Sequence, residues 1–264
     1  MWIAQISDTH LRPEGVLYGG VVDPAAALAT AVAQLDALDP APDLVLHTGD
    51  VTEGGSAEEY ALARKLLAGL PAPLRAIPGN HDERDAFRRA FSDVPRMPGS
   101  GPISYVDAAT GPVRIVALDV TVPGRHHGEV TAEGLAWLDA TLAIEPERPT
   151  LLMMHQAPLR TAVPYIDEYA CRGGEALHAL LRRFPAVRLV ACGHVHRMML
   201  RPFGAGLLCT APSVATAIAL QPRPDAVAAS FLEPPGFLLH HWQGDEMLTH
   251  LVPLGTFPGP FPFA

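Results

Sequence analysis

The order of hydrophobic and polar residues predicts short strands that alternate with helices. Five mostly apolar runs have the composition of central strands covered on both faces, and they span 2–6, 44–47, 74–77, 151–154 and 187–192. Stretches of helical composition lie between or beside them, at 24–38, 57–70, 82–91, 131–143 and 174–184. Strands and helices in repeated succession predict an α/β fold built from βαβ units.

The chain after residue 200 has a different pattern. Short runs at 207–210, 213–216, 236–242 and 246–252 predict strands that are parted by Pro, Gly and acidic turns. We expect residues 200–264 to complete a second sheet packed on the first, within one domain that covers residues 1–264. The proline-rich stretch 221–235 predicts a loop, either near the mouth of a cleft or at a subunit contact.

Side chains that bind metals follow the five predicted central strands. They are Asp8, His10, Asp50, Asn80, His81, His155, His194 and His196. Loops at the carboxyl ends of strands in such sheets converge on one edge, where α/β proteins bind their ligands. Oxygen ligands suit hard ions and imidazole suits Zn, Fe, Mn or Co, so the mixed set predicts a transition-metal pair. Two ions about 4 Å apart clamp a phosphate ester for in-line displacement. The pattern therefore predicts a binuclear metallohydrolase.

The same residues form five motifs in a fixed order: D-x-H at 8–10, G-D at 49–50, G-N-H-D at 79–82, a lone His at 155 and G-H-x-H at 193–196. In this the chain resembles the calcineurin-like metallophosphoesterase superfamily. The Cys171-Arg172-Gly173-Gly174 stretch looks most like bacterial class III cyclic-nucleotide phosphodiesterases and their glycerophosphodiesterase relatives. The resemblance implies a four-layer αββα sandwich, in which two mixed β-sheets are flanked by helices.

The resemblance also implies a role for each residue. It places Asp8, His10 and His196 on one metal, and Asn80, His155 and His194 on the other, with Asp50 bridging the two. The cofactors are then two divalent transition metals, drawn from Fe, Mn, Zn and Co. A hydroxide held between the ions would be the nucleophile, because coordination lowers the pKa of water from 15.7 towards about 7. His81 binds no metal in this scheme. It contacts the substrate, where it stabilises developing charge or protonates the leaving oxygen.

Other polar residues near these motifs have less specific interpretations. We expect Asp82 to cap the helix that starts near Arg84, although it could instead orient His81. His47 is expected to be a strand residue. His126 and His127 lie in a loop after Asp119, and the sequence leaves open whether they reach a substrate. A mixed rim for the cleft is predicted from Gln156, Thr161, Tyr165 and Asp167.

Charge and composition narrow the class of substrate. The net charge of −9 argues against extended nucleic acid, which needs a basic surface, whereas two bound cations would create a local site for a small anion. No apolar run reaches the length of about 18 residues that spans a membrane, and the first strand begins too early for a signal peptide. Cys171, Cys192 and Cys209 form no CxxC motif and suit the cytoplasm, with Cys171 expected to be the more exposed.

The function predicted from these features is hydrolysis of a small phosphodiester, either a 3′,5′-cyclic nucleotide or a glycerophosphodiester. One alternative is a phosphomonoesterase or nucleotidase with the same metals. Another is a catalytically idle metal-binding scaffold, which the complete set of motif residues argues against. The apolar tail 253–264 and the resemblance favour a homo-oligomer, a dimer or larger.

Overall fold

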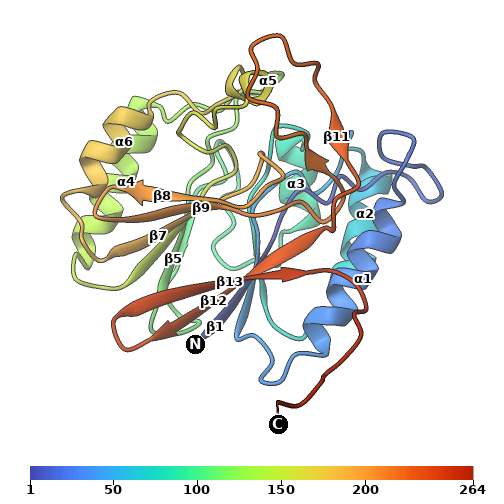
Figure 1. Cartoon of the computed structure of the whole chain (residues 1–264). Helices are drawn as coiled ribbons and strands as arrows, with labels where there is room; N and C mark the ends of the chain where they lie inside the picture. Colours follow the sequence, from blue (N-terminus) through green and yellow to red (C-terminus); the bar gives the residue numbers. More distant parts are fainter. Residues whose placement is uncertain (264) are drawn as a thin grey trace.

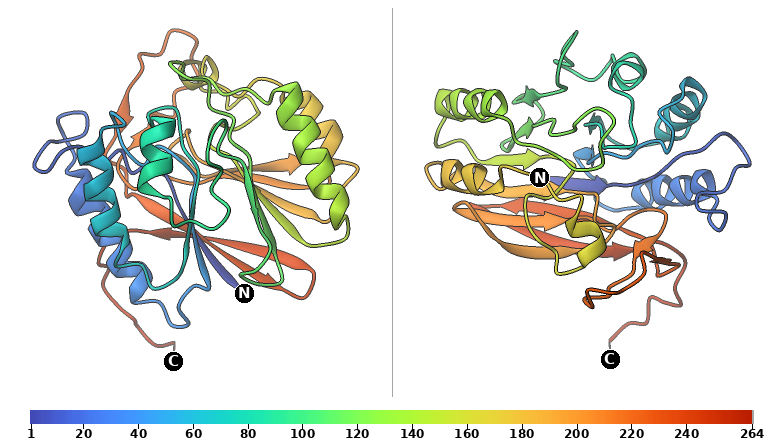
Figure 2. Two further views of the ribbon diagram at one scale, coloured as in Figure 1. Left: turned by 180° about the vertical axis from the view of Figure 1, so that it is seen from behind. Right: turned by 90° about the horizontal axis from the view of Figure 1, so that it is seen from above.

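Two β-sheets packed on each other form the centre of the computed structural model, which describes residues 1–263 (Figure 1). The first sheet has five strands in the order β13 (Glu246–Pro253), β12 (Gly236–Gln243), β1 (Trp2–Ile6), β2 (Leu44–His47) and β3 (Leu74–Ala76). β1, β2 and β3 are parallel, and β12 and β13 are antiparallel to their neighbours. Helices α1 (Pro24–Asp36), α2 (Ala57–Leu67) and α3 (Arg84–Ala90) pack beside it (Figure 2).

The second sheet has six strands. Their order is β4 (Tyr105–Asp107), β5 (Arg114–Ala117), β6 (Thr150–Met153), β7 (Val187–Cys192), β9 (Gly206–Thr210) and β8 (Met199–Phe203). The edge strands β4 and β8 are antiparallel to their neighbours, while the four strands between them are parallel. Helices α4 (Ala132–Ile144) and α6 (Gly174–Leu181) lie together on the other side of the molecule from α1 and α2 (Figure 2). Two mixed sheets flanked by helices confirm the predicted αββα sandwich.

The central strands are buried on both faces because their side chains alternate between two cores. In β6, Leu151 and Met153 belong to the core between the sheets, whereas Leu152 belongs to the core under α4 and α6. Val190 in β7 follows the same rule and faces the helices. Strands that are apolar on both faces gave the continuous hydrophobic runs from which they were predicted.

A buried polar chain links the two sheets. The Gln5 side chain in β1 donates from Nε2 to the carbonyl of Cys192 in β7, at 2.9 Å, and accepts at Oε1 from His240 Nε2 in β12, at 3.0 Å. His240 Nδ1 in turn lies 2.8 Å from the Thr249 hydroxyl in β13. Each polar atom of this chain is paired, which removes the cost of burying it.

The structure differs from the sequence prediction in several elements. The short strands β4, β5 and β8 were not predicted, nor was the ribbon of β10 (Ala217–Ile218) and β11 (Ser230–Phe231). The predicted strand at 213–216 is wrong, because the Ser213 hydroxyl accepts from the backbone N–H groups of Ala215 and Thr216 and so closes a turn. The strands after residue 200 are divided between the sheets, with β8 and β9 in the second and β12 and β13 in the first.

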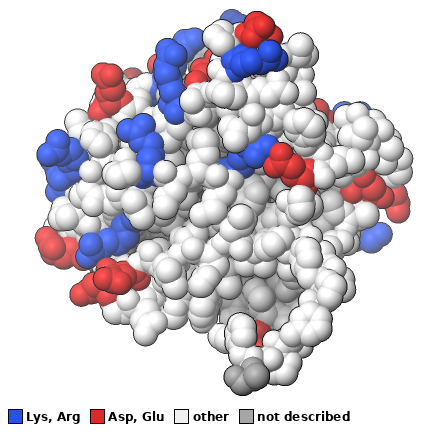
Figure 3. Space-filling view, viewed as in Figure 1, with Lys and Arg blue, Asp and Glu red and all other residues white. Residues whose placement is uncertain are grey.

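Three further features concern the cysteines, the charged surface and the length of the helices. Cys171 is the most exposed of the three cysteines, as expected, although at 7% it is still buried, and all three thiols are unpaired. Charged side chains lie mostly toward the margins of the face in Figure 3, and its middle and lower parts carry few. Among residues 1–263, no helix combines the length and the apolar character needed to cross a bilayer.

Candidate metal centre

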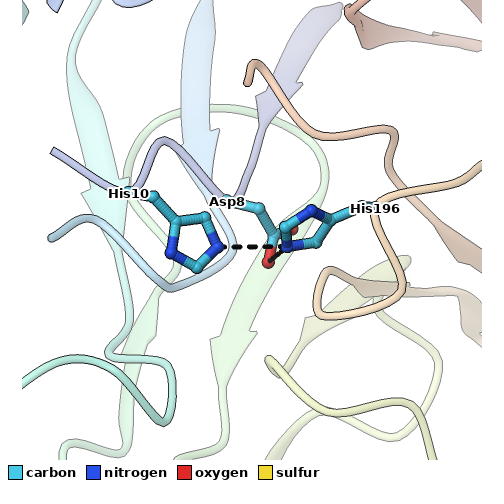
Figure 4. Close-up of side chains that lie close together, drawn as sticks. All are labelled: Asp8, His10 and His196. Atoms are coloured by element: carbon cyan, nitrogen blue, oxygen red, sulfur yellow. Dashed lines mark hydrogen bonds and ion pairs between the residues drawn. The ribbon is translucent and has the colours of Figure 1, made fainter. Parts of the chain in front are cut away.

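The residues predicted to bind metals meet at the carboxyl ends of strands from both sheets. Asp8, His10 and His196 bring one ligand atom each to within 4.8 Å of the others (Figure 4). Asp50, His155 and His194 form a second such group. Six of the eight predicted site residues are buried around these groups, whereas Asn80 is partly exposed and the His81 side chain is 27% exposed.

The backbone at these positions is unusual. Five of the predicted ligands have positive φ angles: Asp8 (54°), His10 (45°), Asp50 (51°), His194 (69°) and His196 (55°). Side chains other than glycine rarely adopt this left-handed region, and each instance costs about 1–3 kcal/mol. The loops hold the conformation by bonding to each other, as in Asp8 N to Gly49 O at 3.0 Å and His10 N to Asp50 O at 3.1 Å. Strain concentrated on these residues marks the place as a functional site.

Two glycines allow the loops to approach. A Cβ on Gly79 would lie 2.1 Å from Oδ1 of Asp50, and a Cβ on Gly193 would lie 2.1 Å from the Ser7 hydroxyl and 2.8 Å from Oδ2 of Asp8. Each of these distances is far inside van der Waals contact. The G-N-H-D and G-H-x-H motifs therefore need glycine for space beside the carboxylates.

The tautomers of the histidines leave ring nitrogens facing the site. His10 Nδ1 lies 2.7 Å from a Glu53 carboxylate oxygen, and His196 Nδ1 lies 2.9 Å from the Thr216 carbonyl. Since both partners can only accept, both Nδ1 atoms carry the proton, which leaves lone pairs on the Nε2 atoms. These two Nε2 atoms are 3.0 Å apart, and a dashed line joins them in Figure 4. Two lone pairs at this distance repel unless a cation lies beside them, so the geometry fits a metal ion.

The second group has the same character. His155 donates from Nδ1 to the Thr48 carbonyl at 2.7 Å, so its Nε2 presents a lone pair, 3.1 Å from Oδ2 of Asp50. Nε2 of His194 is buried and has no hydrogen-bond partner among the described residues. Asp50 Oδ2 also lies 3.8 Å from Nε2 of His10 in the first group. A carboxylate between two sets of unpaired imidazole nitrogens fits a shared ligand for two ions.

Asn80 and its neighbours lie at the edge of the second group. The Asn80 amide oxygen accepts from Gln156 Nε2 at 3.3 Å, and its nitrogen lies 3.2 Å from Nδ1 of His126. Gln156 also donates to the His126 carbonyl, at 3.1 Å. The sequence did not decide whether the loop of His126 and His127 reaches the site. In the structure this loop reaches the site through His126.

Glu53 is a site residue that the motifs did not reveal. Its Oε2 atom lies 2.7 Å from His10 Nδ1 and 3.2 Å from His81 Nδ1. Burial opposes the charged form, but the hydrogen bonds of both imidazoles outweigh it and lower the pKa of Glu53 to about 2. Burial likewise disfavours charged His81, yet Glu53 and Asp50 raise its pKa to about 10. In the sequence, Glu53 could have been noticed only because it is a carboxylate three residues after Asp50.

The expectation that Asp82 caps a helix is wrong. Glu83 caps α3 instead, through its side chain and the N–H groups of Asp85 and Ala86. The Asp82 carboxylate accepts from the backbone N–H of Val51 at 3.0 Å and of Gly79 at 2.9 Å. It therefore ties the G-D loop to the G-N-H-D loop.

A cavity of about 350 Å³ opens over both groups. Predicted site residues line one side of it: His10, Asp50, Asn80, His81, His194 and His196. Tyr18, His126, Tyr165 and Tyr169 line the remainder together with residues of α5 (Pro164–Asp167) and the β10–β11 ribbon. Of the predicted rim, Tyr165 lines the cavity, whereas Thr161 and Asp167 hydrogen-bond to each other, at 2.8 Å. The 221–235 stretch contributes Ala228, Ala229 and Ser230, as expected for a loop at the cleft mouth.

Comparison with known proteins agrees with the fold and the motifs. The sequence model of the calcineurin-like phosphoesterases matches residues 1–198. The probable glycerophosphodiester phosphodiesterase GpdQ of Arcobacter nitrofigilis is 36% identical over 265 residues, covering 100% of this chain and 97% of that protein. The 3′,5′-cyclic adenosine monophosphate phosphodiesterase CpdA of Pseudomonas aeruginosa is 33% identical, over 80% of this chain and 75% of that protein.

Among solved structures, a dimetal phosphatase from Danio rerio superposes with a TM-score of 0.70 at 16% identity, covering 96% of both chains. At this identity the likeness shows a shared fold. The predicted resemblance is confirmed at the level of the superfamily and of the bacterial phosphodiesterases within it. The chain belongs to the calcineurin-like phosphoesterase family.

Proposed function

We propose that the protein is a binuclear metal-dependent phosphodiesterase that hydrolyses a small phosphodiester. The observation that carries this proposal is the position of Asp50, whose Oδ2 lies 3.1 Å from His155 Nε2 and 3.8 Å from His10 Nε2. We assign Asp8, His10 and His196 to one ion, and Asn80, His155 and His194 to the other. When bound, the two divalent ions supply the Lewis acidity that polarises the phosphoryl group and activates water.

The residues around the ions then orient and bind the ester. Glu53, Thr48 and Thr216 fix the imidazole rings through their Nδ1 atoms, so that Nε2 is directed at the ions. His81 lies in the cavity wall beside Asp50, and its backbone N–H donates to Asp50 Oδ1 at 2.9 Å. We propose that its ring stabilises negative charge on the phosphoryl group or protonates the leaving oxygen.

The cavity lining supports a diester as substrate. Among the described residues that line it, none is Lys or Arg. A monoester carries close to two negative charges near neutral pH and a diester carries one. A wall that offers the charged imidazole of His81, whose pKa is raised to about 10, but neither Lys nor Arg does little to reward the second charge. The names of the relatives indicate the two small diesters we propose, a glycerophosphodiester and a 3′,5′-cyclic nucleotide.

Other properties of the molecule support further parts of the proposal. We propose Fe, Mn, Zn or Co as the ions, because the imidazole, carboxylate and amide donors accept all four. Three unpaired thiols support a cytoplasmic location. Exposed apolar side chains on β13 and the tail, such as Leu248, Leu251 and Phe261, support a homo-oligomer of single-domain subunits.

The test is a substrate comparison on metal-reconstituted protein. We expect kcat/KM for bis(p-nitrophenyl) phosphate to exceed that for p-nitrophenyl phosphate by at least about tenfold, which is 1.4 kcal/mol in transition-state binding. Equal or reversed values at matched metal content would favour the phosphomonoesterase alternative. Hydrolysis of neither compound would leave the metal-binding scaffold as the explanation.

A further inference from the structure

We propose that Tyr165 and Tyr169 form a subsite that binds an aromatic ester arm of the substrate. The inference rests on the proposed phosphodiesterase function and adds a preference between substrate classes. It favours a diester that carries a ring, such as an aryl or nucleobase-bearing ester, over one with two short aliphatic arms.

The two tyrosines are placed by a short helix and the turn that follows it. Tyr165 lies in α5, and Tyr169 is four residues later, where its N–H donates to the Ile166 carbonyl at 3.0 Å. Residues four apart in a helical turn share one face, and the two rings meet edge to face with centroids 5.6 Å apart. The bond between Thr161 and Asp167 anchors the turn on its other side. The rings therefore form a fixed pair rather than two independent side chains.

A row of rings connects this pair to the proposed reaction centre. The Tyr169 centroid lies 5.4 Å from that of His126, and the His126 centroid lies 5.5 Å from that of His81. His81, His126, Tyr165 and Tyr169 all line the same cavity. An ester bound at the ions beside His81 thus has this row of rings as one wall.

Most residues beside the tyrosines are apolar, and the others, Thr216 and Ser230, are uncharged. Ile166 and Ile218 line the cavity next to the tyrosines, as do Ala228 and Ala229 from the segment before β11. Tyr165 is 40% exposed, so part of its ring remains available for contact. A planar arm gains both burial and ring–ring contact here, whereas a short aliphatic arm gains burial alone. We therefore expect the lining to distinguish aromatic from aliphatic ester arms by contact with the rings and not by the charge of the arm.

The experiment holds the leaving group constant and varies the other arm. Phenyl p-nitrophenyl phosphate and ethyl p-nitrophenyl phosphate both release p-nitrophenolate, so the ratio of their kcat/KM values reports the second arm. We expect Tyr165→Leu and Tyr169→Leu to lower the phenyl-to-ethyl ratio by about tenfold relative to wild type, with kcat/KM for the ethyl ester changed less than about twofold. Tyr165→Phe and Tyr169→Phe are the matched controls and should keep the wild-type ratio, because they keep the ring.

A binding measurement separates recognition from chemistry. Calorimetric titration of the metal-loaded protein with diphenyl phosphate should show a Kd raised about tenfold in the Leu variants and unchanged in the Phe variants, while diethyl phosphate binds all forms equally. Metal content and the unfolding midpoint, measured on every variant, verify that the fold is retained.

The outcomes are distinguishable. An unchanged phenyl-to-ethyl ratio in the Leu variants, or an equal loss on both esters, would overturn the subsite while leaving the phosphodiesterase assignment intact. If the wild-type protein hydrolyses neither the phenyl nor the ethyl ester, the proposed function and this subsite are both overturned.

Discussion

Oε2 of Glu53 lies 3.2 Å from Nδ1 of His81, and none of the five sequence motifs described above contains this glutamate. The same oxygen is 2.7 Å from Nδ1 of His10, so a single carboxylate orients a proposed metal ligand and a proposed substrate contact together. Carboxylates that hold metal-binding imidazoles commonly contribute 10- to 100-fold to affinity or activity. Glu53 therefore links metal binding by His10 to substrate contact by His81 in the proposed mechanism.

We predict that Glu53→Ala lowers kcat/KM by about 10- to 100-fold and weakens one metal site, because His10 loses its outer partner. Glu53→Gln should lose less, since the amide oxygen can still accept from an imidazole. If Glu53 acts partly through His81, the double variant with His81→Ala will lose less than the product of the single losses. The exposed Glu58 in α2 provides the control, and Glu58→Ala should behave as wild type. Full additivity in the double variant would show that the two residues act independently.

His81→Ala should keep both ions and lose about 100- to 10,000-fold in rate, the range for one positioned acid or base. If His81 protonates the leaving oxygen, the loss will shrink for esters of acidic phenols, whose anions leave without a proton. A loss that is uniform across leaving groups would instead indicate charge stabilisation. The measurement is a leaving-group series on wild type and variant, with metal content determined on both. Absence of one ion from the variant would contradict our placing of His81 outside the ligand set.

Asp50→Ala should abolish turnover and reduce the binding of both ions, because its carboxylate lies between the two histidine groups. Asn80→Ala should chiefly weaken the site of His155 and His194 and leave the other occupied at moderate metal concentration. Elemental analysis of purified variants, dialysed against equal free metal, measures both effects. The bridging assignment is wrong if Asp50→Ala and wild type hold the same number of ions.

The buried imidazole of His240, which is not one of the proposed metal ligands, makes stability depend on pH. Burial lowers its pKa to about 3 from an ordinary value of 6.5, so between these values the unfolded chain binds a proton that the folded chain excludes. The contribution of His240 to the free energy of unfolding should therefore be highest above pH 6.5 and fall as pH drops towards 3. A single group of this kind contributes about 2 kcal/mol of loss between pH 7 and pH 5.

Urea unfolding of the metal-free protein in chelator, at several pH values, measures this dependence. His240→Gln should lower stability at neutral pH yet flatten the slope between pH 5 and 7. His250→Gln changes an exposed histidine on the neighbouring strand and should leave the slope as in wild type. An unchanged slope in His240→Gln would refute the assignment of this acid sensitivity to His240.

Much of the fold could be predicted because its signal is local. The run at 151–154 is apolar throughout and the run at 187–192 is apolar except for the exposed Arg188, since β6 and β7 are buried on both faces. β4 and β5 have three and four residues, as do the predicted β3 and β2, but neither is followed by one of the metal-binding motifs. The turn at Ser213 depends on hydrogen bonds of its hydroxyl, which no pattern of apolar residues records.

In the site, too, the features with a local sequence signal could be predicted, and those that depend on contacts between distant residues could not. The motifs named the residues that meet in the two groups, because each motif follows a strand end. They could not show Glu53, whose role depends on a distance of 3.2 Å to a residue 28 positions away. Nor could they show the left-handed backbone of Asp8 or His194, which is imposed by bonds between loops of different strands. Asp82 was misassigned for the same reason, since its partners Val51 and Gly79 are brought to it by the fold.

The pairing of β1 has a consequence for how the chain acquires its structure during synthesis. β1 lies between β2 and β12, so residues Trp2 to Gln5 are paired on one side with Leu238 to His241. The ribosome releases β1 first, and its second neighbour emerges only when nearly all of the chain has been made. A nascent chain ending at residue 198, where the family's sequence model stops, would leave the strand that precedes Asp8 and His10 with an unpaired edge. The strand that precedes the first loop of the metal centre therefore gains its second neighbour only after residues 238–241 have been synthesised.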